Sequence, residues 1–334
     1  MGGGTPRPGG RLPGLEALRG VAAICVLLLH VRAVYGGQPV FGKGYLGVDF
    51  FLMLSGFLMA RVQESRLLAG MDPWGFLWKR YKRLWPMMAA GGVLGLPRLW
   101  TRTASLPEFV GTAAANFALL PIPFGREAFP LNIPAWTIFY ELVANALHVL
   151  LFWRLRGVWL PLAILALAPV VAWIGMTWGS LDVGARPEHF LAGLPRVCFA
   201  YLIGIALSRW WSEGPPFPMP PALAIPAMPL VLAGGWWLGL DRTWLFDFAF
   251  VVLVCPLMIA GALRLDRFHR AAGLLGQLSF PLFALQMPVL QGLRLLGFGY
   301  WHGLFAALAM GVAGMVTANA LGDWRRRRTM ETAR

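Results

Sequence analysis

The sequence has little charge and almost no cysteine. Charged side chains make up 13% of the 334 residues, against 58% hydrophobic residues, and the mean hydropathy is +0.62. A soluble domain needs a polar shell around its core, so this composition excludes one. Cys25, Cys198 and Cys255 lie inside apolar segments and form no CxxC pattern. This excludes a disulfide framework and indicates no metal site.

Long apolar runs fill the chain instead. Segments of about 20 residues, enough for a helix to cross a hydrocarbon layer of ~30 Å, recur between short Arg, Pro and Gly clusters. The sequence therefore predicts an all-α, polytopic membrane helix bundle with about ten transmembrane helices. The expected spans are residues 15–35, 45–61, 84–100, 132–153, 158–176, 189–209, 221–239, 244–263, 273–296 and 301–321.

The segments outside these spans are short. The apolar run from Val110 to Leu120 ends before two prolines, and we interpret it as a re-entrant or interfacial piece of a loop. One domain, residues 15–321, then follows a flexible basic lead, residues 1–14, and precedes a basic tail, residues 322–334. The lead resembles the start of a signal peptide, but the run after it contains charges and lacks a small-residue cleavage site, so we expect no cleavage.

The distribution of basic residues predicts the orientation. With these spans, nineteen Lys and Arg residues fall on the side of the N-terminus, seven on the other side and three within spans. Because cytoplasmic loops carry the excess of Lys and Arg, both termini are expected in the cytoplasm. The net charge is +14, but the basic residues are scattered along membrane-flanking loops. Anionic lipid explains this pattern better than nucleic acid does.

Polar side chains inside spans are the first candidates for function, because each costs about 2.5–3.5 kcal/mol to insert. Arg19 and His30 lie in the first span. Eleven residues turn a helix by about 1100°, close to three full turns, so both side chains share one face about 16 Å apart. This spacing fits the two ends of a long substrate. The alternative is that Arg19 snorkels to the inner headgroups and His30 lies at the outer interface.

The second expected span contains Asp49 and Ser55, together with Gly47 and Gly56, which allow another helix to approach closely. Asp49 is either a functional acid or an ordinary interface residue. The basic sequence WKRYKRLWP follows as an expected loop ending where Pro86 opens the next span. It indicates either a membrane anchor or a site for a phosphate-bearing cofactor.

The fourth expected span opens with NIPAWTIFYELVANALH, which holds Trp136, Tyr140, Glu141 and His148. An acid within a span normally faces the protein interior, so Glu141 is a candidate functional residue. His148 lies two turns further on nearly the same face and is interpreted as structural. The remaining histidines, His189, His269 and His302, fall at loops or span ends and are interpreted in the same way.

Five segments in this order resemble the acyltransferase family 3 of membrane proteins. They are LEALRGVAAICVLLLH, GYLGVDFFLMLSGF, RYKRLWP, PAWTIFYEL and LGQLSFPLFALQMPV, running from Leu15 to Val289. The resemblance implies transfer of an acyl group, usually acetyl from acetyl-CoA, to a hydroxyl of a cell-surface carbohydrate. It also implies an enzyme of the bacterial inner membrane, in the form without a fused esterase-like domain.

The resemblance assigns roles to individual residues. The arginine and histidine of the family's first helix fall on Arg19 and His30, and the acid and serine of its second helix on Asp49 and Ser55. The family's paired basic residues and later acid fall on Arg80, Arg83 and Glu141, with Trp136 and Tyr140 as supporting residues. The last motif often carries a histidine where this chain has Gln286, so no second histidine is expected to share the chemistry.

These roles suggest a mechanism. His30 is expected to take the proton of the attacking hydroxyl, with Asp49 or Glu141 orienting its imidazole, while Arg19, Arg80 and Arg83 bind the phosphates of CoA. A covalent acyl-histidine is equally compatible. The partners are then acyl-CoA, a carbohydrate acceptor and the bilayer, with no permanently bound cofactor. A transporter or flippase for a glycan or lipid-linked substrate is the competing class, although the sequence has no inverted repeat.

Overall fold

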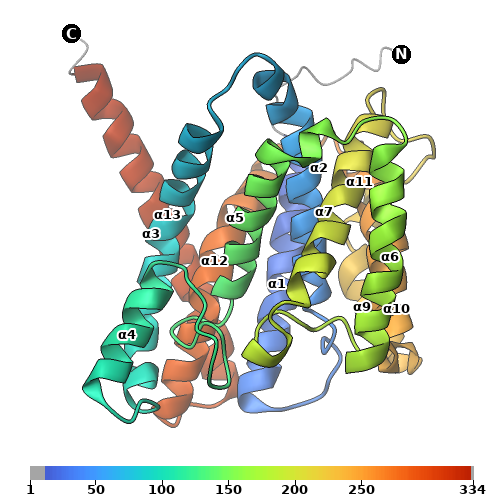
Figure 1. Ribbon diagram of the computed structural model, residues 1–334. Helices are drawn as coiled ribbons and strands as arrows, with labels where there is room; N and C mark the ends of the chain where they lie inside the picture. Colours follow the sequence, from blue (N-terminus) through green and yellow to red (C-terminus); the bar gives the residue numbers. More distant parts are fainter. Residues whose placement is uncertain (1–11, 332–334) are drawn as a thin grey trace.

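A computed structural model describes residues 12–331, and these residues form helices and loops with no strand among them (Figure 1). The all-α prediction is therefore confirmed. The helices are α1 (Pro13–Tyr35), α2 (Leu46–Leu68), α3 (Pro73–Trp100), α4 (Leu106–Phe117), α5 (Ala135–Leu150), η1 (Phe152–Arg154), α6 (Trp159–Trp178), η2 (Pro187–His189), α7 (Gly193–Trp210), α8 (Pro221–Ala224), α9 (Ala227–Trp237), η3 (Leu240–Arg242), α10 (Trp244–Ala249), η4 (Phe250–Val254), α11 (Cys255–Ala262), α12 (His269–Leu295) and α13 (Tyr300–Glu331).

Six helical segments in the described part of the chain are long and apolar enough to cross a membrane: Pro13–Tyr35, Leu46–Leu68, Trp159–Trp178, Trp244–Ala262, His269–Leu295 and Tyr300–Trp324. They confirm a membrane helix bundle. The four other expected spans correspond to α3, α5, α7 and α9, so the number of ten crossings stays a prediction. The apolar run at Val110–Leu120 belongs mainly to α4, whose twelve residues extend only about 18 Å.

The outer surface of the bundle is apolar. On α6, Trp159, Leu165 and Trp173 are each at least 60% exposed, and only 11% of the apolar window of α13 is buried. Large apolar side chains left uncovered along whole helices indicate contact with lipid rather than water. The protein is therefore an integral membrane protein.

Glycine brings α2 close to its neighbours, as the sequence predicts. A Cβ on Gly56 would collide with the backbone carbonyl of Tyr201 in α7, and a Cβ on Gly204 would collide with the carbonyl of Met53 in α2. Gly47 packs in the same way against α1, where a Cβ would lie 3.2 Å from the carbonyl oxygen of Ala22. Small residues let the helix backbones touch in the absence of a hydrophobic driving force.

The basic segment before Pro86 forms helix rather than the expected loop, so that prediction is wrong. Helix α3 begins thirteen residues earlier, at Pro73, where the Asp72 carboxylate accepts hydrogen bonds from the backbone N–H groups of Trp74 and Gly75. This cap and a proline in the first turn favour helix initiation there. Pro86 then lies inside the helix, a position that packed membrane helices tolerate.

The ends of the chain differ from expectation in one respect. Residues 1–11 of the expected lead, residues 1–14, lie outside the described residues. The tail does not separate from the last span, because α13 runs without a break from Tyr300 to Glu331. Elsewhere in the fold, the expected span 244–263 is one helical rod with an internal π turn, Phe250–Val254. Pro256 follows this turn, and its missing N–H breaks the regular bonding pattern.

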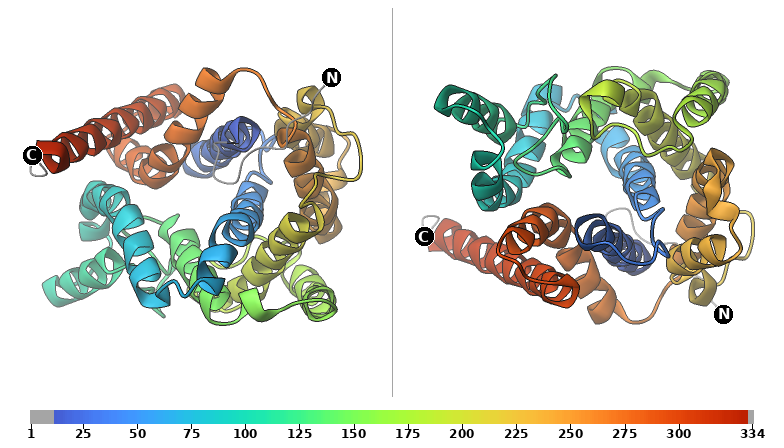
Figure 2. Two further views of the ribbon diagram at one scale, coloured as in Figure 1. Left: turned by 90° about the horizontal axis from the view of Figure 1, so that it is seen from above. Right: turned by 90° about the horizontal axis from the view of Figure 1, so that it is seen from below.

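Two groups of helices face each other across the bundle (Figure 2). Helices α1 and α12 lie side by side in one group, while α2, α3 and α5 lie in the other. The start of α1 and the end of α13 lie at one end of the bundle, and α4 with its loops lies at the opposite end (Figure 1). The space between the two groups holds the cavities that matter for function.

Candidate active site

A cavity of about 450 Å³ is lined by three arginines from two helices. Arg19 comes from α1, while Arg80 and Arg83 come from α3, where a spacing of three residues places them on one face of the helix. Arg80 donates hydrogen bonds to Glu141 Oε1 at 2.6 Å and to Ser55 Oγ at 3.2 Å. We call this space the arginine cavity.

The charges of the arginine cavity favour an anion. Three guanidinium groups face one carboxylate there, that of Glu141. Arg83 makes no ion pair within residues 12–331, so its charge is left for a ligand. Guanidinium groups match phosphate oxygens with paired, charge-assisted hydrogen bonds, and a cleft with low-dielectric walls concentrates their field.

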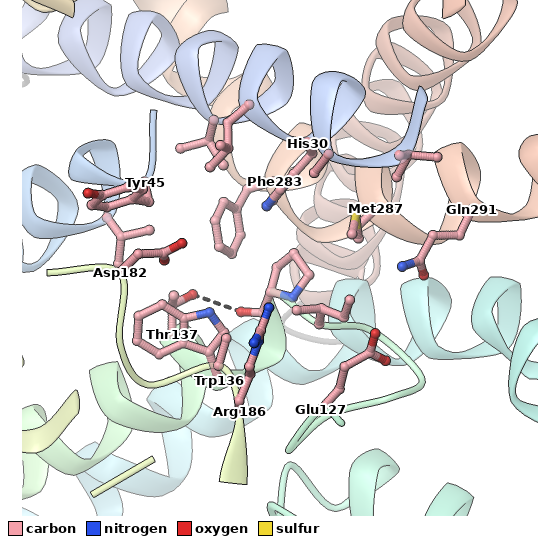
Figure 3. Close-up of a pocket in the computed structure, with 18 of the residues that line it drawn as sticks. His30, Tyr45, Glu127, Trp136, Thr137, Asp182, Arg186, Phe283, Met287 and Gln291 are labelled. Atoms are coloured by element: carbon pink, nitrogen blue, oxygen red, sulfur yellow. Dashed lines mark hydrogen bonds between the residues drawn. The ribbon is translucent and has the colours of Figure 1, made fainter. Parts of the chain in front are cut away.

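A second cavity, of about 530 Å³, contains His30 and is called the His30 cavity. The imidazole enters it from α1, and Trp136, Thr137 and Arg186 lie on the opposite side (Figure 3). The Nδ1 atom of His30 is buried and has no hydrogen-bond partner among the described residues. The imidazole is thus held by packing and is not committed to a protein acid.

The wall of the His30 cavity combines aromatic rings with polar groups. Tyr45 and Trp136 supply rings, Asp182 a carboxylate and Gln291 an amide. Gln291 is 9% exposed, and its buried Oε1 atom has no hydrogen-bond partner among residues 12–331. Asp182 is open to the cavity, yet the walls around it partly desolvate its carboxyl and raise its pKa, an effect that Arg196 opposes.

The two cavities adjoin. Their linings share three residues, Val48 from α2, Thr137 from α5 and Phe283 from α12. We call these three residues the neck. The arginines and His30 therefore lie on opposite sides of the neck, and the eleven helical residues from Arg19 to His30 separate these two by about 16 Å.

Asp49 does not contact His30. Its carboxylate accepts hydrogen bonds from Arg196 Nε at 2.8 Å and Nη2 at 2.6 Å, and both side chains are 1% exposed. The guanidinium of Arg196 also lies over the rings of Tyr45, at 5.5 Å, and Trp136, at 5.6 Å. Asp49 thus anchors the arginine on which two aromatic walls of the His30 cavity rest.

The other predicted residues divide between the two cavities. Glu141 and Ser55 hold Arg80 in the arginine cavity, and Trp136 lines the His30 cavity. Tyr140 lines neither: its hydroxyl donates to the carbonyl of Phe190, and its ring stacks on that of Phe190 at 5.0 Å. The structure therefore brings together the three arginines but places neither predicted acid against the imidazole.

Sequence reasoning missed three residues of the site. Arg196 is one of the three basic residues that the sequence places inside spans. The free-energy cost of burying its charge could have marked it as a candidate. Asp182 and Gln291 gave no comparable signal, because one lies in a loop and the other near a helix end. Only the fold places them at one cavity.

Comparison with known proteins identifies the family. A family model described as an acyltransferase domain matches residues 12–320. The chain belongs to acyltransferase family 3. Two relatives of this family 3 chain come from rhizobia. It is 27% identical over 320 residues to the exopolysaccharide production protein ExoZ of Rhizobium meliloti (strain 1021), covering 85% of this chain and 89% of ExoZ. It is 36% identical over 155 residues to protein 2 in the picA locus of Rhizobium radiobacter, covering 40% of this chain and 78% of that protein.

No solved structure matches this family 3 chain. Family membership and the apolar helices establish a membrane acyltransferase. Such an enzyme needs an acyl donor and an acceptor, and the two joined cavities are the places where the fold offers room for them.

Proposed function

We propose that this protein moves an acetyl group from acetyl-CoA, bound at the arginine cavity, to a hydroxyl of an exported carbohydrate in the His30 cavity. The observation that carries this proposal is that the cationic cavity and the cavity that contains the imidazole adjoin at the neck. The phosphates of CoA match Arg19, Arg80 and Arg83. The flexible arm of CoA then directs the thioester through the neck.

The chemistry follows from the position of His30. The imidazole accepts the proton of the acceptor hydroxyl while the oxygen bonds to the thioester carbonyl carbon. The carbon–sulfur bond then breaks, and the imidazolium returns the proton to the departing thiolate of CoA. An acyl-histidine route reaches the same products, because the ring nitrogen first takes the acyl group and the hydroxyl then receives it.

In this proposal Glu141 and Asp49 act indirectly, because each holds an arginine of the site in place. Glu141 fixes the guanidinium of Arg80, and Asp49 fixes that of Arg196, against which Tyr45 and Trp136 pack. A rigid second layer of this kind holds a site in its productive geometry. Ser55 contributes a further acceptor for Arg80.

The acceptor is proposed to be an exopolysaccharide or its lipid-linked precursor, in line with the printed name of one relative, the exopolysaccharide production protein ExoZ. The rings of Tyr45 and Trp136 suit the apolar faces of sugars, and the charged and amide groups around them suit sugar hydroxyls. The arginine cavity lies toward the chain ends, since Arg19 is in the second turn of α1 and His30 is near its far end. Cytoplasmic termini in a bacterial inner membrane then place CoA in the cytoplasm and the acceptor outside.

Transfer of label tests the function directly. Purified protein in detergent is mixed with acetyl-CoA labelled in its acetyl group and with host exopolysaccharide whose esters have been removed by mild alkali. The proposal predicts alkali-labile label in the polysaccharide. Label that stays in acetyl-CoA with this polysaccharide and with its lipid-linked precursors contradicts the proposed function.

The variant Arg83→Ala is expected to raise the KM for acetyl-CoA at least tenfold with little change in kcat. Arg83, like Arg19, lines the cavity without an ion pair among the described residues, and a hydrogen bond to a charged group contributes about 1.5–3 kcal/mol. Steady-state kinetics measures the effect. The control is Lys82→Ala, which removes the neighbouring charge but lies over the ring of Trp78 outside the cavity. Equal KM values in the two variants would contradict the assigned phosphate site.

A further inference from the structure

The neck is buried and almost entirely apolar. Val48 is 5% exposed, and Thr137 and Phe283 are each 6% exposed, so little open surface remains between the cavities. The hydroxyl of Thr137 donates to the carbonyl of Pro134 at 2.8 Å, which leaves its methyl group for the neck. The three residues come from three different helices, α2, α5 and α12.

Phe283 is the largest residue of the neck, and its ring packs against another aromatic ring. Its ring meets that of Phe51 edge-on, with centroids 6.2 Å apart. Phe51 lines the arginine cavity, and Met287, one helical turn after Phe283, lines the His30 cavity. Packed interiors deform little around a group that is too large for them. A donor arm that reaches from the arginine cavity into the His30 cavity therefore meets this ring.

The orientation of the bound acyl-CoA decides which of its groups reaches the neck first. With the phosphates at the arginines, the acyl group leads, and the sulfur and the thin two-carbon end of the CoA arm follow it. Every part that reaches His30 crosses the neck. An unbranched acyl chain is as thin as the arm behind it, whereas a chain branched beside the carbonyl, or one bearing a ring there, is wider.

We propose that Phe283, facing Val48 and Thr137, selects the acyl group by its cross-section. Acetyl and other short unbranched groups pass the neck, and groups that are branched or cyclic next to the carbonyl are rejected. This inference rests on the proposed function and adds the acyl specificity of the same site. The arginine cavity binds all these donors alike, so discrimination arises between binding and transfer.

A comparison of acyl donors tests whether the neck selects the acyl group. The wild-type protein and Phe283→Ala are compared with acetyl-CoA, isobutyryl-CoA and benzoyl-CoA, with de-esterified exopolysaccharide as acceptor. The wild type is expected to favour acetyl-CoA over isobutyryl-CoA at least tenfold in kcat/KM, in the range that one or two carbon atoms give in a tight pocket. The variant is expected to reduce this ratio at least tenfold while it retains acetyl transfer.

The matched control is Phe280→Ala, because Phe280 lies one turn away on α12 and lines only the arginine cavity. Its ratio of kcat/KM for acetyl-CoA to kcat/KM for isobutyryl-CoA is expected to equal that of the wild type. An unchanged ratio in Phe283→Ala, or an equal change in Phe280→Ala, would overturn the proposal. If the wild type transfers acetyl but Phe283→Ala keeps the wild-type donor ratio, only the selection of the acyl group by Phe283 is contradicted. If the wild type transfers no acetyl group, the proposed function is contradicted as well.

A second variant covers the case in which Phe283→Ala does not fold. Phe283→Trp fills the neck further, so acetyl transfer is expected to fall at least tenfold while equilibrium binding of acetyl-CoA stays within about twofold. Transfer at the wild-type rate in this variant, with normal binding, would show that the passage does not run beside this ring.

Discussion

Replacement of His30 by glutamine is expected to lower acetyl transfer by about 10² to 10⁴-fold, the usual contribution of a positioned general base. His30 is the histidine that lines the cavity beyond the neck. Glutamine keeps a polar side chain of similar length but does not accept the proton at neutral pH. The initial rate of label transfer to the polysaccharide measures the effect.

Two controls separate a lost base from a lost fold. His302→Gln changes an exposed histidine of α13 that lines neither cavity and should leave the rate unchanged. Equilibrium binding of acetyl-CoA should also survive in His30→Gln, because the phosphate site lies beyond the neck. Full transfer activity in a folded His30→Gln protein would remove the imidazole from the mechanism.

Replacement of Asp49 by leucine is expected to destabilise the protein by about 3–5 kcal/mol, because it leaves the guanidinium of Arg196 buried without a counter-charge. The loss extends to the site, since Tyr45 and Trp136 pack against that guanidinium. Thermal unfolding in detergent, together with the fraction of protein that stays monodisperse, measures the effect.

A double variant tests the cause. Asp49→Leu combined with Arg196→Met removes both charges and should recover much of the lost stability, because a buried ion pair is often replaceable by apolar groups. Loss of the exposed pair between Asp323 and Arg326, through Asp323→Asn, should cost at most about 1 kcal/mol. If Asp49→Leu alone unfolds at the wild-type temperature, the pair does not support the fold.

Much of the fold could be predicted from sequence, because the bilayer imposes simple demands on length and hydropathy. Helices lie in all ten expected spans, and Gly47 and Gly56 mark real close contacts of α2. The start of α3 was missed because Pro86 suggests a helix start, whereas the Asp72–Pro73 cap lies thirteen residues earlier. A proline inside a packed membrane helix has no distinct local pattern.

The site could be predicted only in part. Arg19 stands out as a charge inside a span, whereas only the family resemblance picks Arg80 and Arg83 from their basic cluster. The structure places all three in one cavity. The partner of Asp49 could not be predicted, since Arg196 is 147 positions away and only packing of α2 on α7 brings the two together. Phe283 is one of 22 phenylalanines, and nothing in its local sequence marks it as the residue between two cavities.

The central claim is that the acyl group travels through the bundle, from the arginines to His30. Sealed proteoliposomes test it, with labelled acetyl-CoA inside and de-esterified exopolysaccharide outside. A thioesterase added outside hydrolyses any acetyl-CoA that leaks. The account predicts labelled polysaccharide outside intact vesicles, and less of it with His30→Gln. Transfer only after the vesicles are opened with detergent would contradict the account.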